Sequence, residues 1–468
     1  MNFPAEYMIA NAQGGQRENG SCNVDLAEAV LTISPESGAG LMFSWRDIAE
    51  LKAADYKVFL TSLSGDRVEF SSLGYQYEDF LRIASALRNK MLIKDSLLDE
   101  PLKKSQIEAH YSFQDAAGIE KAQGQCELRI YETALLLVPD GAGMKRFSFR
   151  DAAGVQAGDR ELSLTLDSGE KLLLSKFGAQ FDYFKTHLSE QMNQMLLMGQ
   201  KLLKSIMPDL DGLALRKASL VLKEGWLLPL SEIEKICPGF FARLEKTLGA
   251  DPENKKEFAL LKSLSRQERI CFGFKKGLGG GASEDYFLLL FPVYSADPAK
   301  PGNAVAMEAF RTEQENEVIG ENAGKRATYF FRLTSRKDYP LTKDISGLDE
   351  KMTAFTRFFN AAMSAVNFRR APLFLSDSKL EEPRYARYRA AVARIPELRA
   401  LRDVYIGRVI HSSSESWIED ISNLLAFNIH SNDDRAKWLK SQLPDAAEEK
   451  IDNEELLEEQ AVPGQEKK

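Results

Sequence analysis

A gapless repeat at a spacing of 104 residues is the feature that most restricts how this chain can fold. Cys22 recurs as Cys126, and residues 43–47 (FSWRD) recur as residues 147–151 (FSFRD) at the same spacing. Roughly 25 identities fall in about 90 aligned pairs without a gap. Chance similarity between two strand-rich segments does not keep a constant offset over such a length. The first part of the chain is therefore predicted to contain one module twice.

Each copy is predicted to contain several short strands followed by one helix. In the first copy, short apolar runs are separated by glycines and by Asp/Ser turns such as residues 64–66, which is typical of antiparallel hairpins. A helix follows Gly74, because apolar residues then recur at spacings of three and four and form one stripe. The second copy keeps both features. The stripe predicts that each helix packs on the strands of its own copy.

This pattern of seven short strands and a C-terminal helix resembles the pleckstrin-homology-like fold. The corner at residues 43–48 resembles a strand-to-strand turn of bacterial and GRAM-type members, and the resemblance covers residues 3–97 and 107–206. It implies bent β-barrels, each closed by its C-terminal helix. We therefore expect a mainly β chain with helices (α+β) and pleckstrin-like units at residues 1–102 and 103–208.

The rest of the chain is predicted to contain three further segments. Strand-like runs followed by an amphipathic helix predict a diverged third pleckstrin-like unit, or another α+β unit, at residues 209–378, with a helical insertion near residues 238–265. Residues 379–442 are predicted to form an arginine-rich helical region. Residues 443–468 contain nine acidic and three basic side chains and few large apolar ones, which predicts an acidic disordered tail.

Composition favours a cytoplasmic protein. The formal net charge of −8 disfavours a protein that coats nucleic acid or lies on an anionic membrane surface. Four cysteines in 468 residues are too few for a disulfide framework, which fits a reducing compartment. No apolar run approaches the ~20 residues of a membrane-spanning helix. Residues 1–13 lack the pattern of a secretory signal, so none is expected.

No sequence motif predicts catalysis, a metal site or a cofactor site. The histidines at 110, 187, 411 and 430 lack metal-ligand spacing, and no two cysteines form CxxC. His411 precedes three serines, but no elbow motif accompanies them, so a helix-ending loop is favoured over a nucleophile. The glycines of residues 275–281 precede a strand instead of a Lys-Ser/Thr-headed helix, which favours a hairpin loop over a phosphate loop. A non-enzyme is favoured.

Two features of the repeat bear on binding. The loop with which lipid-binding pleckstrin-like domains hold phosphoinositides contains one base next to an acid in each copy, Arg17 and then Lys121, which disfavours that ligand. The pair Arg46-Asp47 recurs as Arg150-Asp151. A partner could use these charges, but repetition at a strand corner favours a local ion pair or an Asp-capped turn.

The strongest charged feature is an arginine-rich stretch interleaved with tyrosines. Guanidinium and tyrosine groups bind phosphate backbones and acidic peptides, so this stretch is a candidate partner-binding site. Pairing of the arginines with neighbouring acids such as Glu381 and Glu382 is the structural alternative. The candidate partner-binding residues are Arg384, Tyr385, Arg387, Tyr388, Arg389 and Arg394.

The sequence is consistent with three functions. A repeat without a shared catalytic group favours a non-catalytic scaffold whose tandem pleckstrin-like units bind a protein partner. The second is a nucleic-acid-associated or chaperone-like protein that uses the arginine-rich helix while the acidic tail competes for it. In outline, tandem pleckstrin-like units with an acidic tail resemble the histone-chaperone FACT subunits. The third is an enzyme with a site in residues 209–440.

Overall fold

The described part of the chain forms two compact units. A computed structural model describes residues 1–95, 100–140, 143–276, 285–295, 302–311, 326–339, 346–411, 413–431, 433–438 and 440. The first unit comprises Met1–Asn193 and Leu380–Arg394, and the second comprises Gln194–Lys379 and Ile395–Lys468. Helices and strands occur in both, so the α+β class is confirmed. The predicted acidic tail and residues 277–281 of the glycine-rich loop lie outside the described residues.

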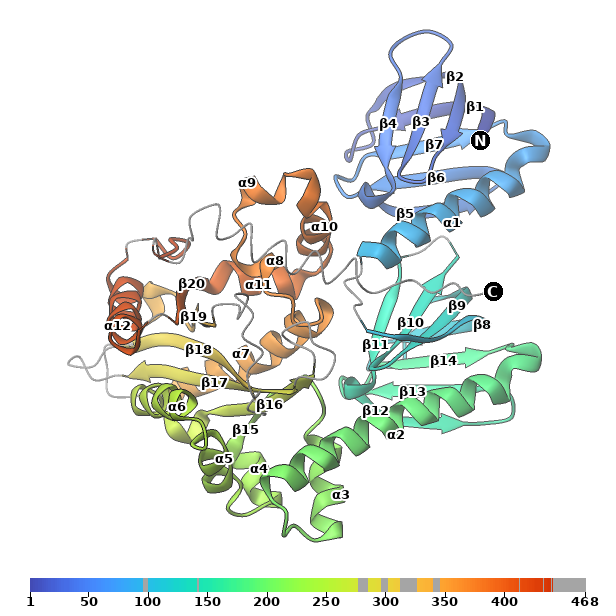
Figure 1. Ribbon diagram of the computed structural model, residues 1–468. Helices are drawn as coiled ribbons and strands as arrows, with labels where there is room; N and C mark the ends of the chain where they lie inside the picture. Colours follow the sequence, from blue (N-terminus) through green and yellow to red (C-terminus); the bar gives the residue numbers. More distant parts are fainter. Residues whose placement is uncertain are drawn as a thin grey trace, which may run out of the picture. The chain divides into compact units, whose positions relative to one another are not determined.

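The first unit contains two antiparallel sheets of seven strands each (Figure 1). The first sheet comprises β1 (Asn2–Ala10), β2 (Gln16–Leu26), β3 (Val30–Pro35), β4 (Leu41–Ser44), β5 (Ile48–Ala54), β6 (Lys57–Ser62) and β7 (Arg67–Ser71). The second comprises β8 (Leu102–Gln114), β9 (Glu120–Tyr131), β10 (Ala134–Pro139), β11 (Lys145–Ser148), β12 (Ala152–Ala157), β13 (Leu162–Leu166) and β14 (Lys171–Ser175).

The two sheets have the same order of strands. The first runs β4-β3-β2-β1-β7-β6-β5, and the second runs β11-β10-β9-β8-β14-β13-β12. A 3₁₀ turn joins the fourth and fifth strands of each sheet, η1 (Trp45–Asp47) in the first and η3 (Phe149–Asp151) in the second. After the seventh strand come the 3₁₀ turns η2 (Gly74–Gln76) and η4 (Gly178–Gln180), which lead into α1 (Tyr77–Asp95) and α2 (Phe181–Ile206).

Alternating burial explains how the first sheet and its helix pack. Every second side chain of β1 is buried, so one face of the sheet is apolar and the other faces solvent. The Phe80 ring of α1 lies 5.2 Å from the Phe3 ring and 5.4 Å from the Phe70 ring, measured between centroids. In the second copy the rings of Phe177 and Phe184 are 4.9 Å apart. The apolar stripe of α1 therefore covers the sheet of its own copy.

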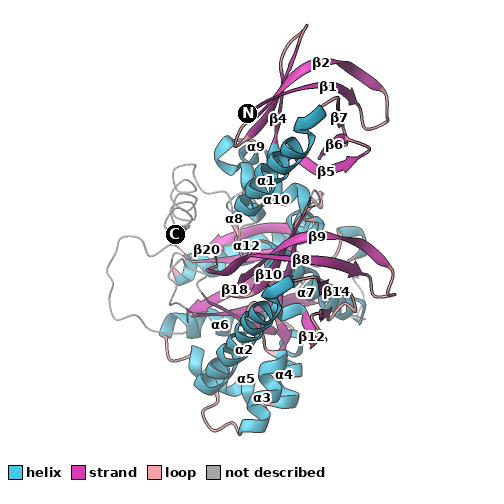
Figure 2. Cartoon of the chain, turned by 90° about the vertical axis from the view of Figure 1, so that its right-hand side faces the viewer, coloured by secondary structure: helices cyan, strands magenta, loops and turns pink. Residues whose placement is uncertain are grey.

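The described residues of the second unit form a six-stranded sheet with helices. The helices are α3 (Gly212–Val221), α4 (Leu230–Ile236), α5 (Phe240–Leu248), α6 (Pro252–Leu264), α7 (Ser346–Ala365), α8 (Ala371–Phe374), α9 (Asp377–Leu380), α11 (Pro396–Val404) and α12 (Ser414–His430), with 3₁₀ turns η5 (Gln267–Arg269) and η6 (Arg336–Asp338). The strands are β15 (Leu228–Pro229), β16 (Cys271–Lys276), β17 (Asp285–Ser295), β18 (Gly302–Arg311), β19 (Ala327–Arg332) and β20 (Tyr405–Ile410), paired in that order. Figure 2 shows the strands and helices of both units.

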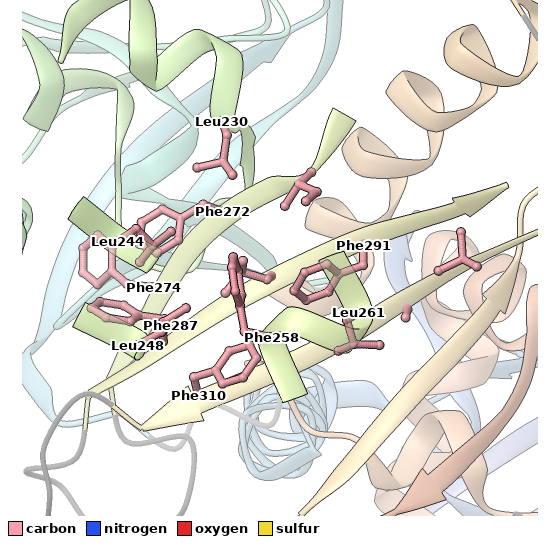
Figure 3. Packing of buried hydrophobic residues seen from close by; sticks show 14 of the residues in the cluster. Leu230, Leu244, Leu248, Phe258, Leu261, Phe272, Phe274, Phe287, Phe291 and Phe310 are labelled. Carbon is pink, nitrogen blue, oxygen red and sulfur yellow. The ribbon is translucent and has the colours of Figure 1, made fainter. Parts of the chain in front are cut away.

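Residues 209–378 were expected to form a diverged third pleckstrin-like unit or another α+β unit, and the order of strands in this sheet differs from that in the first two sheets. Its strands pair consecutively, unlike those of the first two sheets, and its last strand comes from residues 405–410. The physical reason is burial on both faces: β18 is buried along almost its whole length. Phe258 of α6 packs on Phe291 on one face (Figure 3), and Phe331 packs on Phe355 of α7.

The region 379–442, expected to be helical and arginine-rich, contains more than helices. It contains strand β20, and its residues Leu380–Arg394 belong to the first unit while the remainder belongs to the second. The six residues of β20 pair antiparallel with β19. A short strand set between helices rich in arginine carries too little periodicity to be recognised in the sequence.

Candidate functional site

The predicted partner-binding residues lie on a short helical segment that the first unit holds. The 3₁₀ turn η7 (Pro383–Tyr385) leads into α10 (Ala386–Arg394), and Pro383 suits the first turn because it needs no amide donor there. α10 packs on α1 of the first copy. Residues on both sides of this segment belong to the second unit.

The two tyrosines of the predicted set are buried. Tyr385 and Tyr388 expose 0% and 1% of their surface, and their rings stack with centroids 6.3 Å apart. The Arg384 guanidinium lies 4.6 Å from the centre of the Tyr385 ring. These tyrosines are therefore core residues in the observed arrangement, where they cannot stack on a partner.

Two of the predicted arginines pair with acids of the same segment. Arg384 Nε lies 2.9 Å from Glu382 Oε2, and Arg389 Nη1 lies 2.9 Å from Glu381 Oε2. These contacts are the structural alternative to partner binding, in which the arginines pair with neighbouring acids. Because the four side chains are partly or fully exposed, each pair contributes only about 0–1 kcal/mol.

Arg394, the last residue of α10, reaches the repeated corner of the first copy. Its Nη2 donates a hydrogen bond to the main-chain carbonyl oxygen of Arg46 in η1. Burial lowers the pKa of Arg394, and the nearby carboxylates of Asp95 and Asp47 oppose that shift. Of the predicted residues, Arg394 is thus the one that the structure brings to the Arg46-Asp47 pair.

Asp95 at the end of α1 completes this corner. Arg46 Nε lies 2.7 Å from Asp95 Oδ2, so the predicted local ion pair of Arg46 forms with Asp95 rather than with Asp47. The Asp95 side chain is 1% exposed, and its Oδ1 has no hydrogen-bond partner among the described residues. Arg88 Nη2 donates to the carbonyl oxygen of Ala49 at 2.6 Å. Burial, and then the charge of Arg394, lower the pKa of Arg88 to about 10.

The polar end of α1 was detectable in the sequence. The buried residues of this helix are Phe80, Ala84, Arg88, Leu92 and Asp95, which continue one stripe at spacings of four and three. Charged residues on a stripe that is otherwise apolar indicate buried ionic contacts. The second copy has no such end, because the repeat spacing places Gly199 where the first copy has Asp95.

The most strongly perturbed histidine lies in the second unit. His411 Nδ1 is 2.6 Å from Glu257 Oε1 on α6, and its Nε2 is 3.1 Å from Glu308 Oε2 on β18. Burial on its own lowers the pKa of His411, but the hydrogen bonds to Glu257 and Glu308 outweigh it and raise the pKa to about 9. At neutral pH the ring is an imidazolium that donates to both carboxylates, so it cannot act as a general base.

The hydroxyl group beside His411 is equally unsuited to catalysis. Thr328 is 0% exposed, and its Oγ1 donates to Glu308 and accepts a hydrogen bond from Trp417 Nε1 at 3.1 Å. A nucleophile needs access to a substrate, which full burial denies. The His411 cluster therefore joins elements of the fold.

A hollow of about 630 Å³ in the second unit has the size of a small-molecule site. Phe355 and Phe358 of α7 form part of its apolar wall. Its charged lining contains both signs, Arg332, Lys351 and Arg435 together with Asp338, Asp403 and Asp434. Since neither sign predominates, the lining selects no class of ligand. Among the described residues, no three His, Cys, Asp or Glu side chains are grouped so that they could hold a metal ion.

Comparison with known proteins does not assign this chain to a family. No protein-family description matches the sequence, and no curated protein matches it. Among solved structures, the Spt16D Pob3N heterodimer matches with 15% identity and a TM-score of 0.15, over 36% of this chain and 82% of that one. A TM-score this low supports no conclusion about this chain. Among the helices of the described residues, none combines the length and the apolar character needed to cross a lipid bilayer.

Proposed function

We propose that this chain is a non-catalytic protein-interaction protein built on two pleckstrin-like modules, residues 1–102 and 103–208. The modules are followed by an α+β unit at residues 209–378, a partly helical region at 379–442 and the acidic tail at 443–468. One observation carries the proposal: the first module already holds a helical segment from far along the chain, through α1 and the corner at Arg46. A module that binds a helix in this way has the features of a protein-binding module.

The contact with α10 combines three elements of protein recognition. The corner offers a main-chain carbonyl of η1, the carboxylates of Asp47 and Asp95, and the side of α1. A buried guanidinium that donates to a carbonyl and lies near carboxylates is characteristic of strong interface contacts. We place the protein in the cytoplasm, because its four cysteines are buried and unpaired, which fits a reducing compartment.

The test is capture of partners from cells that make the protein, with cross-links fixed before lysis. We expect a stoichiometric protein partner whose cross-links map to residues 1–208. Absence of any stoichiometric partner, or cross-links confined to residues 209–379 and 395–440, would contradict the proposal.

Arg384 and Arg389 remain the proposed contact residues of the arginine-rich segment, because their side chains are 35% and 41% exposed. Replacing both with alanine is expected to reduce the captured partner at least threefold. Arg82→Ala is the matched control, since Arg82 on α1 is also an exposed arginine in an ion pair, with Asp79. Equal losses in both variants would show that the effect is not specific to this segment.

A further inference from the structure

We propose that the corner of the first module is a receptor site for an arginine-ended helix of a protein partner, and that α10 is its resident, exchangeable occupant. We call this site the Asp95 corner and define it as η1 together with Asp95. The inference rests on the proposed function and names the chemistry of the partner: a short basic helix whose last turn carries an arginine.

The geometry of the resident helix defines what the site recognises. Arg394 lies at the C-terminal end of α10, where a cation interacts favourably with the helix dipole. Its guanidinium donates to the carbonyl oxygen of Arg46 and lies near the carboxylates of Asp47 and Asp95. Lysine has a single ammonium group and cannot present the planar fork of donors that such a set of acceptors requires.

The resident helix leaves one buried acceptor of the site unsatisfied. Asp95 Oδ2 binds Arg46 Nε at 2.7 Å, whereas Asp95 Oδ1 has no hydrogen-bond partner among the described residues. A buried carboxylate oxygen without a donor disfavours the state that contains it. An incoming arginine that supplies this missing hydrogen bond would bind better than Arg394 does.

Like charges also weaken the hold on α10. Arg46 and Arg88 lie in the same corner, and the charge of Arg394 contributes to the lowered pKa of Arg88. Burial also disfavours the charged form of Arg394 itself. Arg46 and Arg394 thus share the carboxylate of Asp95, and Arg88 adds a third positive charge nearby, an arrangement that favours exchange of the occupant.

The connection of α10 to the second unit sets how strongly a partner must compete. The chain enters from the second unit before Leu380 and returns to it after Arg394, so the resident helix stays close to its site. A tethered segment has an effective concentration of about 1 mM or more. A free helix should therefore bind the wild-type chain weakly and a chain with an impaired resident helix more tightly.

The test uses a fluorescein-labelled peptide of residues 380–396, titrated with the full chain and followed by fluorescence anisotropy. We expect the Arg394→Ala chain to bind it at least tenfold more tightly than the wild-type chain does. The same peptide carrying Arg394→Ala should lose at least tenfold in affinity for that variant chain. Equal affinity of the two chains, or of the two peptides, would overturn the inference.

A second measurement protects the test against a variant that folds poorly. Excess unlabelled peptide added to the wild-type chain should accelerate amide hydrogen exchange in α10, while the Arg394→Ala peptide should not. No acceleration would contradict exchange at this site. Dimers of the wild-type chain that Arg394→Ala abolishes would assign the site to a second copy and overturn the assignment to a different protein.

The outcomes separate this inference from the proposed function. Peptide binding without a captured cellular partner would contradict the proposed function and leave the receptor site standing. A captured partner that cross-links to residues 1–208, combined with no peptide binding, would contradict the receptor site alone.

Discussion

At the scale of single residues, His411 is a titratable group that links several elements of the second unit. Its imidazolium binds Glu257 of α6 and Glu308 of β18, and its ring lies 4.9 Å from that of Trp417 on α12. Arg326 also binds Glu257, and Thr328 also binds Glu308, so each carboxylate has a second donor. One charged ring therefore links two helices and a strand of the same unit.

This arrangement predicts that the second unit loses stability at alkaline pH. The pKa of His411 in the folded protein is about 9, above the value of ~6.5 expected when unfolded. The stabilisation is therefore fully present below about pH 6.5 and disappears as the pH rises toward 9. The loss should reach about 3 kcal/mol. Urea unfolding followed by tryptophan fluorescence at pH 6, 7.5 and 9.5 measures it.

The matched variant for this prediction is His411→Gln, which keeps a hydrogen-bonding side chain but does not titrate in this pH range. Its unfolding free energy should be lower than that of the wild type at pH 6, and the loss of stability that His411 causes in the wild type as the pH rises toward 9 should be absent. A wild-type profile that stays flat over this range would show that His411 does not hold its proton as the structure indicates.

The roles of such residues were beyond prediction from the sequence because their partners are distant. Glu257 and Glu308 lie 154 and 103 positions from His411, and no local pattern connects them. The sequence indicated a helix-ending loop at this position, whereas His411 follows strand β20, and its ion pairs were not foreseen. By contrast, Arg88 and Asp95 share a helix with the apolar stripe, so their burial was open to prediction.

At the scale of elements, local patterns predicted more in the first two sheets than in the third. Alternating burial and glycine turns are local properties, and the repeat shows each of them twice. Gly65 and Gly169, for example, have φ values of 88° and 87° in equivalent hairpin turns. The third sheet is buried on both faces, so its strands lack alternation and their order could not be deduced.

Close packing of β16 predicts a large effect from a small substitution. A Cβ atom at Gly273 would lie 2.7 Å from the carbonyl oxygen of Trp226 and 3.1 Å from Leu227 Cγ. Gly273→Ala should therefore destabilise the second unit by about 2 kcal/mol, because the backbone of the adjacent segment must move. Urea unfolding and hydrogen exchange in β15 and β16 measure the loss.

Gly347 in α7 is the matched control, because no atom of the described residues lies within 4 Å of the position its Cβ would take. Gly347→Ala should be neutral or stabilise the protein by up to about 1 kcal/mol, since alanine favours a helix more than glycine does. If the two alanine variants behaved alike, the close approach at Gly273 would not be the cause.

At the scale of the whole molecule, neither compact unit is one continuous stretch of chain. Leu380–Arg394 belongs to the first unit although the residues on both sides belong to the second. This arrangement was not predicted, because the arginine-rich composition of the segment indicated a surface for a partner. Its attachment depends on a contact between residues 348 positions apart, which no pattern along the chain records.

The attachment predicts that a single substitution in α10 destabilises the first unit selectively. Arg394→Ala removes the hydrogen bond to the carbonyl oxygen of Arg46 and one of the cations near Asp95. We expect a loss of about 1–2 kcal/mol in the first unit and none in the second. Hydrogen exchange resolved along the chain measures it, with faster exchange expected in η1 and the last turn of α1. Arg82→Ala, at an exposed position of α1, should leave these exchange rates unchanged.

The origin of α10 late in the chain also has a consequence during biosynthesis. Arg394 follows Arg46 by 348 positions. At ~5–20 residues per second, the ribosome completes α10 about 20–70 s after the strands of the first module have emerged. Throughout that interval the Asp95 corner is vacant, so a nascent chain offers it to any basic helix nearby before its own arrives.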